Sequence, residues 1–201
     1  LGELRPEQMA TLLDRRHEVT SEEMELATRA WDAYRSPDAR AIESLIAGDT
    51  SSLPYLAPAM RRHLQRFPSV RNGLGRTEQA SLDVLAQGPA DFVSLFLRVS
   101  DMEETPYFGD TMLLDELMGL ASGDAPLLVV NGLERTQGLR RYQWPLKEIG
   151  FDLTDAGHAV RECRADRVRI RGIDRWLGGV HLRGSESVWR WDEEAASLVY
   201  G

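Results

Sequence analysis

The sequence predicts an α+β protein, and three observations carry that prediction. Residues 1–70 repeat apolar side chains at the three- and four-residue spacing of amphipathic helices. Residues 71–165 combine three further helical patterns with two strand-like runs. Residues 166–201 alternate apolar and charged side chains with the two-residue period of short strands. We therefore expect an N-terminal helical subdomain, a mixed central domain, and a C-terminal β-meander packed on the central domain.

The N-terminal part is expected to contain four helices. Thr20 and Glu23 have the spacing of a capping box, in which each side chain accepts a hydrogen bond from the other residue's backbone N–H. Proline fits the first turn of a helix and glycine the position after the last turn, so these residues mark other helix ends. The expected helices are 6–16, a segment after Thr20 that reaches Tyr34, the stretch from Ser36-Pro37 to Gly48, and 53–67.

The central part resembles a winged helix in the order of its predicted elements. Asn and Gly residues in SVRNGLGR, residues 69–76, indicate a linker in front of it. Three helices and a hairpin follow, and the hairpin turn is signalled by Asn131-Gly132. The piece LTDAGHAV resembles the step from the wing strand into a helix in bacterial winged-helix regulators. The expected elements are helices from the cap Thr77 to Gly88, over 90–100 and over 110–122, strands at 127–130 and ending at 151–154, and a helix capped by Thr154.

The C-terminal part is expected to join the wing hairpin in one antiparallel sheet. Val168 and Ile170 alternate with arginines, which predicts a half-buried strand with a basic outer face. The stretch GIDRWLGGVHL is expected to connect two strands, with Gly178-Gly179 at the bend because glycine permits positive φ or a close backbone approach. Further strands are expected around 189–191 and 198–200.

Composition limits the classes of protein to which the chain can belong. The chain has 201 residues, 42% hydrophobic and 28% charged, with a formal net charge of −8. These values are typical of a globular protein and argue against one that coats nucleic acid along its length. The one cysteine, Cys163, leaves no internal disulfide and fits a reducing cytoplasm. We find neither a signal peptide nor an apolar run of about 20 residues, so we expect a cytoplasmic protein without a membrane segment.

The third helix of the predicted winged helix argues against reading DNA. It contains Asp110, Asp115 and Glu116 and neither Lys nor Arg. In a helix-turn-helix this helix enters the major groove, where acidic side chains would face phosphates. Contact with a protein partner, or self-association, is therefore expected rather than DNA binding. The acidic stretch 101–124 is expected to meet a basic partner or the Arg-rich C-terminal strands of a second copy.

The wing is the remaining candidate for contact with nucleic acid or another anion. Tyr142 and Trp144 are interleaved with its basic residues, and arginines beside aromatic rings can hold phosphate and stack on bases. The alternative is a solvated hairpin whose aromatic rings pack on the body. The candidate contact residues are Arg135, Arg140, Arg141 and Lys147.

A second candidate cluster, a ligand site or a structural one, lies in GIDRWLGGVHL. It consists of Asp174, Arg175, Trp176 and His181. Asp174 and His181 can in principle form an acid–base pair. The alternative is a connector in which Trp176 anchors the chain and Asp174 ties Arg175 or a backbone N–H.

The sequence predicts no catalytic, cofactor-binding or metal-binding residue. We find no nucleophile-elbow, phosphate-loop or HExxH motif. His158 and Cys163 are five residues apart on a predicted helix, which is a poor match to the four-residue spacing of facing ligands. An enzymatic activity is therefore not expected of this chain itself.

Four phrases together resemble the C-terminal part of a bacterial family that carries domain of unknown function 1835. They are LRPEQMATLLDRR, RRHLQRFPSVRNGLGRTEQ, NGLERTQGLRRYQWPLKEIG and GIDRWLGGVHL, and the resemblance covers nearly all of the chain. It implies that an α/β segment precedes this part and is absent here, which would account for the missing initiator Met. The resemblance brings no residue roles with it.

These observations favour a regulatory or protein-interaction module of a longer bacterial chain. One alternative is a DNA-binding transcriptional regulator that contacts DNA through the wing. Another is the accessory part of an enzyme whose active site lies in an absent N-terminal α/β segment.

Overall fold

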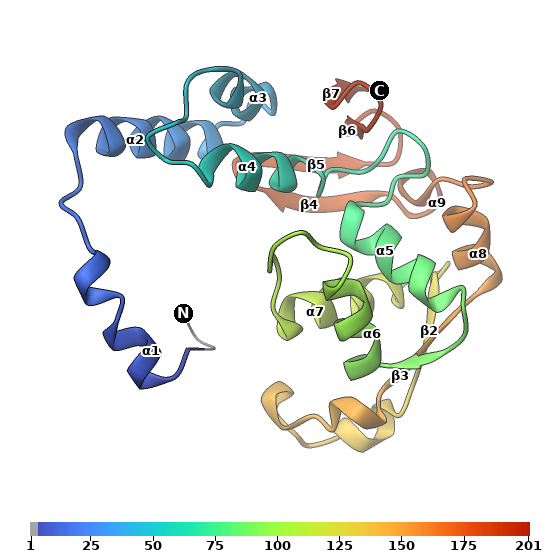
Figure 1. Ribbon diagram of the computed structural model, residues 1–201. Helices are drawn as coiled ribbons and strands as arrows, with labels where there is room; N and C mark the ends of the chain where they lie inside the picture. Colours follow the sequence, from blue (N-terminus) through green and yellow to red (C-terminus); the bar gives the residue numbers. More distant parts are fainter. Residues whose placement is uncertain (1–3) are drawn as a thin grey trace.

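The computed structural model describes residues 4–201 and confirms the α+β class, with 46% helix and 15% strand. Figure 1 shows α2–α4 and the C-terminal strands together at the top, and the central part below them. Among the described residues, buried apolar side chains form one core in the central part and a second core elsewhere. The second core joins Ile42, Leu64 and Phe67 to Ile173, Leu177 and Leu182. The C-terminal strands thus bury their apolar side chains against the N-terminal helices. The prediction that these strands form a β-meander packed on the central domain is therefore wrong.

The N-terminal part begins with a short arm that stands away from the other elements (Figure 1). The arm holds α1 (Pro6–Ala10) and a 3₁₀ turn (Leu13–Arg15), so the helix expected over 6–16 is broken. Every described residue before Ser21 is exposed. The capping box is confirmed, because Thr20 N–H donates to Glu23 Oε2 at 2.7 Å and Glu23 N–H donates to Thr20 Oγ1 at 3.2 Å. Helices α2 (Ser21–Arg35), α3 (Arg40–Ala47) and α4 (Leu56–Leu64) follow.

The central part has the expected order of three helices, two paired strands and a helix, with one added strand. β1 pairs with β3, and β3 pairs with β2, all antiparallel. β1 replaces the start of the helix expected at Ala90, because Asp91 accepts hydrogen bonds from the N–H groups of Val93 and Ser94 and caps the helix there. The elements are α5 (Arg76–Leu85), β1 (Ala90–Asp91), α6 (Phe92–Ser100), α7 (Asp110–Leu120), β2 (Leu128–Asn131), β3 (Gly150–Leu153) and α8 (Asp155–Arg161), the last capped by Thr154 as expected.

The wing is longer than the tight hairpin that Asn131-Gly132 signals. Residues 132–149 separate β2 from β3 and contain three 3₁₀ turns, at Leu133–Thr136, Arg141–Gln143 and Leu146–Glu148. Gly132 has φ of +83°, and a Cβ there would lie 2.1 Å from the carbonyl oxygen of Glu148. The glycine therefore lets the two ends of a long loop meet.

The C-terminal part differs from the expected sheet in two ways. Residues expected as its first strand form α9 (Arg167–Arg171), because the Asp166 side chain caps the Arg169 N–H at 2.9 Å and Gly172, at φ +68°, ends the helix. The described strands also form separate sheets, not one sheet with the wing. β4 (Ile173–Leu177) pairs with β5 (Val180–Gly184), and β6 (Trp189–Asp192) pairs with β7 (Ser197–Tyr200).

The bend at Gly178-Gly179 makes the close backbone approach that its glycines suggest. Gly179 N–H donates to the carbonyl oxygen of Tyr34 at 2.8 Å. A Cβ on Gly178 would lie 2.2 Å from that oxygen, and one on Gly179 would lie 2.0 Å from the carbonyl oxygen of Arg35. The hairpin β4–β5 is therefore docked on the C-terminal end of α2.

Candidate functional site

Strand alternation divides the cluster predicted in GIDRWLGGVHL between two faces of β4–β5. Asp174, Trp176 and His181 are exposed, and Arg175 points to the opposite, buried face. His181 Nε2 lies 2.7 Å from Asp174 Oδ1, which lowers the pKa of Asp174 by hydrogen bonding. The rings of His181 and Trp176 are stacked, with centroids 4.3 Å apart.

These contacts follow from the register of the hairpin. Trp176 and His181 are directly opposite each other in the pairing of β4 with β5, and such cross-strand pairs stabilise a sheet. Of the four predicted residues, Asp174 lines one of the two cavities described below, and the others line neither. The structure therefore brings three of the four residues together on an exposed strand surface and not in a closed active site.

The wing residues are also divided, and acids neutralise two of them. Arg135 forms an ion pair with Glu148, and Arg141 forms one with Asp115 of α7. Arg140 and Lys147 are exposed and form no ion pair within residues 4–201. Trp144 is half-buried against the central core, whereas Tyr142 is 78% exposed. The interleaved basic and aromatic surface that would hold phosphates is thus only partly formed.

A buried ion network, which sequence reasoning missed, joins the central and C-terminal parts of the chain. Its centre is Glu78 on α5, which is 3% exposed. Arg175 of β4 donates to Glu78 Oε1 at 2.6 Å, Gly75 N–H donates to Oε2 at 2.8 Å, and Arg167 Nε of α9 lies 3.9 Å from Oε1. Burial alone raises the pKa of Glu78, but Arg175 and Arg167 outweigh it and lower the pKa to about 2. The available signal was the spacing of Gly75 and Glu78, which is that of a capping box.

A second buried ion pair lies beside the first. Arg62 of α4 is 9% exposed, and its Nε donates to Glu103 Oε2 at 3.0 Å. Its Nη2 donates to Thr77 Oγ1 of α5 at 2.7 Å, and its guanidinium lies 3.9 Å from the centre of the Tyr107 ring. Because buried charges are costly unless they are paired, these contacts hold α4 in one position against the central part.

Helix α7, the third helix of the predicted winged helix, is held by arginines of its own chain. Glu116 lies 4.0 Å from Arg66, which follows the C-terminal end of α4, and burial raises the pKa of Glu116. Arg171 of α9 donates to the carbonyl oxygens of Gly119 and Leu120 at the C-terminal end of α7, at 3.1 and 3.3 Å. The acidic stretch expected to attract a basic partner or a second copy thus contacts arginines of its own chain.

The stretch 69–76, expected to be a linker, is a packed junction. Asn72 is 2% exposed and donates to the carbonyl oxygen of Val160 at 3.0 Å, while its own carbonyl oxygen accepts from Arg167 N–H at 2.8 Å. Helix α5 begins at Arg76, not after the expected cap Thr77. The junction lies between the central part and the C-terminal part, so it fixes their relative positions.

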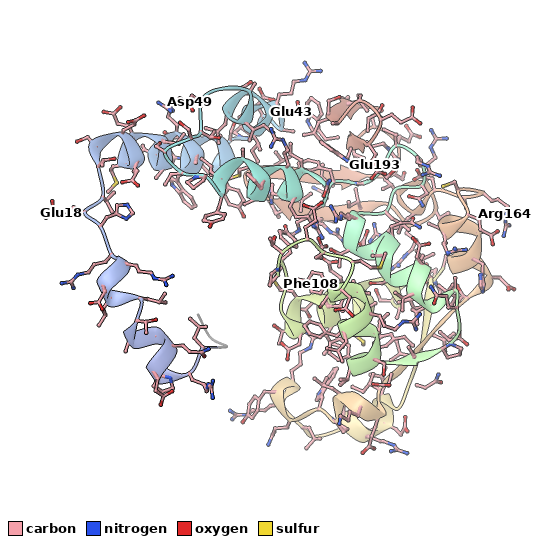
Figure 2. The ribbon with its side chains drawn as sticks, in the orientation of Figure 1. Glu18, Glu43, Asp49, Phe108, Arg164 and Glu193 are labelled. Atoms are coloured by element: carbon pink, nitrogen blue, oxygen red, sulfur yellow. The ribbon has the colours of Figure 1, made fainter. Side chains whose placement is uncertain are left out.

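A cavity of 510 Å³ lies along this junction. Figure 2 shows Glu193, one of its lining residues, near the loop that precedes α5. The charged groups of the lining largely pair, since Arg161 donates to Asp83 at 2.8 Å and Arg76 lies 3.4 Å from Glu103. The charged residues of the lining are Arg71, Arg76, Arg161, Asp83, Glu103 and Glu193, so their formal charges cancel.

A second, shallower depression of 570 Å³ lies at the end of β4–β5 away from the glycine bend. Its formal charge is positive, with three arginines against one acid. It is lined by Arg169, Ile170, Arg171, Gly172, Ile173, Asp174, Arg183, Gly184 and Ser185.

Comparison with known proteins adds no assignment to this geometry. No protein-family model matches the chain, and no match was found among curated proteins or among solved structures. The resemblance to the family with domain of unknown function 1835 therefore stays a prediction. Within residues 4–201, we find no group of three or more His, Cys, Asp or Glu side chains placed to hold a metal ion. None of the helices in the described part has the length and apolar character needed to cross a membrane.

Proposed function

We propose that the chain is a regulatory or protein-interaction module, built around a winged helix that does not read DNA. The order α5–β1–α6–α7–β2–β3 and the sheet order β1-β3-β2 support the winged helix, with α7 in the place of the reading helix. The observation that carries the proposal is the engagement of α7 within the chain. Glu116 is turned toward Arg66, and Arg171 holds the C-terminal end of the helix.

The charge of α7 supports the same function. Asp110 and Asp115 are exposed on it, and Asp115 is also paired with Arg141 of the wing. A DNA-binding helix needs free cations, whereas an acidic helix repels phosphates at low salt. Two wing cations, Arg140 and Lys147, form no ion pair with the residues that the structure describes. They support the alternative of a DNA-binding regulator more weakly than α7 opposes it.

We expect the purified chain to show no tight, salt-sensitive binding to mixed-sequence duplex DNA at low ionic strength. The measurement is fluorescence anisotropy of labelled duplexes over a salt series, because phosphate contacts make affinity fall steeply with salt. The double variant Arg140→Ala/Arg141→Ala serves as the matched control and should behave like the wild type. Tight binding that the double variant loses would instead establish the wing as a DNA contact and overturn the proposed function.

A further inference from the structure

The exposed face of β4–β5 continues without a break into the basic depression. Trp176 stacks on His181, His181 contacts Asp174, and Asp174 is one of the lining residues of the depression. Arg183 Nε lies 4.0 Å from Asp174 Oδ2 on the neighbouring strand. We call this continuous area, from Trp176 and His181 to the residues of the depression, the β4–β5 surface.

The arginines of this surface retain hydrogen-bond donors for an anionic group. The Arg169 side chain forms no ion pair within the described part of the chain, and Arg169 is exposed. The side chain of Arg183 is 77% exposed, and the acid beside it already contacts His181. Arg171 donates hydrogen bonds to the carbonyl oxygens of Gly119 and Leu120 in α7, and its positive charge adds to the charge of the surface. Arginine binds carboxylates through a planar fork of N–H groups, so the site suits acidic side chains.

Apolar side chains lie exposed beside these charges. Trp176 is 63% exposed and Ile170 is 42% exposed. Tryptophan and arginine are the residues that contribute most often to the binding energy of protein interfaces. An exposed tryptophan next to exposed arginines is therefore the composition of a binding surface for a protein segment that carries both acidic and apolar side chains.

We propose that the β4–β5 surface binds an acidic segment of a partner protein. The carboxylates of that segment contact Arg169 and Arg183, and one apolar side chain covers Trp176. Charge complementarity selects this partner, because the surface is basic within a chain whose net charge is −8. The inference rests on the proposed function and identifies the surface and the chemistry of the partner through which it would act.

The test measures binding of labelled peptides to the full chain by fluorescence anisotropy. The probes are a Glu/Leu peptide, a Lys/Leu peptide and a Glu/Gly peptide of equal length. We expect the Glu/Leu peptide to bind most tightly, and Arg169→Gln/Arg183→Gln to weaken it by about tenfold and to flatten its salt dependence. Trp176→Ala should weaken the Glu/Leu peptide by about tenfold and leave the Glu/Gly peptide nearly unchanged.

Arg164→Gln is the matched control, because Arg164 points outward from the loop between α8 and α9 and already pairs with Glu162 (Figure 2). It should leave peptide binding unchanged. All substituted residues are exposed, so we expect each variant to fold, and thermal unfolding checks this.

Absence of Glu/Leu binding, equal binding of the Lys/Leu peptide, or equal loss of binding in Arg164→Gln would overturn the proposal. A dimer that Arg169→Gln/Arg183→Gln dissociates in sedimentation would assign the surface to self-association instead. The DNA titration tests the proposed function separately, so failure of the peptide test alone leaves that function standing.

Discussion

Replacing Glu78 with Gln is expected to lower the free energy of unfolding by about 3–5 kcal/mol, because removing one partner of a buried ion pair leaves the other charge uncompensated. Arg175 would lose its hydrogen bond to Glu78 Oε1, and Arg167 would lose the acid 3.9 Å from its Nε. Both guanidinium groups are largely buried, so water replaces the lost contacts poorly. Urea or guanidinium denaturation of the variant and the wild type measures the loss.

The same residue predicts how stability depends on pH. The pKa of Glu78 is about 2 in the folded chain, below its ordinary value of 4.5. The ionised group therefore stabilises the folded state fully above pH 4.5, and this contribution decreases as pH falls toward 2. A pKa difference of this size between the unfolded and the folded chain corresponds to about 3 kcal/mol of folding free energy. This is of the same order as the expected loss of stability in Glu78→Gln.

The control for this prediction is Glu186→Gln, since Glu186 is exposed in the loop between β5 and β6. It should change the free energy of unfolding by less than about 0.5 kcal/mol. The difference in stability between Glu78→Gln and the wild type should shrink between pH 4.5 and 2, because the wild type loses the contribution that the variant lacks. A difference that stays constant down to pH 2 would contradict the role of Glu78.

Replacing Gly179 with Ala is expected to lower the free energy of unfolding by about 3 kcal/mol. The added Cβ would lie 2.0 Å from the carbonyl oxygen of Arg35 and 2.6 Å from that of Ser36. Because these are backbone atoms, the hairpin must move away from α2 and weaken the hydrogen bond from Gly179 N–H to Tyr34. The measurement is again denaturant unfolding, with amide exchange at Gly179 as a local report.

Gly119→Ala is the matched control, because no atom outside its own helix lies within 4 Å of a Cβ there. Alanine has a higher helix propensity than glycine, so this substitution in α7 should stabilise the chain by up to about 1 kcal/mol. Equal effects of the two substitutions would show that the approach of the hairpin to α2 does not constrain Gly179.

Local signals in the sequence predicted most helices and their caps. Thr20 and Thr154 cap the helices that follow them, and the apolar spacing of 110–122 corresponds to α7. The segment RVRIR was misread, because its alternating pattern suits a strand. The segment forms a helix instead, because the Asp166 side chain caps its N-terminus and Val168 is buried in the second core.

The candidate sites were predicted less completely than the elements that carry them. GIDRWLGGVHL was expected to be a connector anchored by Trp176, but residues 173–177 form strand β4 and Trp176 is exposed. Strand alternation puts Asp174 and Trp176 on one face and Arg175 on the other, and the sequence does not say which face is buried. That face is set by docking of the hairpin on α2 and by its apolar side chains in the second core. The spacing of Gly75 and Glu78 marks the start of a helix but does not predict that Glu78 is buried, because Arg167 and Arg175 cover it only in the folded chain.

The sequence by itself determined the α+β class, the presence of most helices and the acidic character of α7, because these properties depend on contacts within a few residues and on composition. The tertiary structure alone decided that α7 is held by Arg66 and Arg171 and that Glu78 meets Arg175, which is 97 residues away. It also decided that Trp176 and Arg183 lie on the exposed face of β4–β5. Such pairings depend on how separate parts of the chain dock, because a buried charge is stable only where a distant partner can reach it.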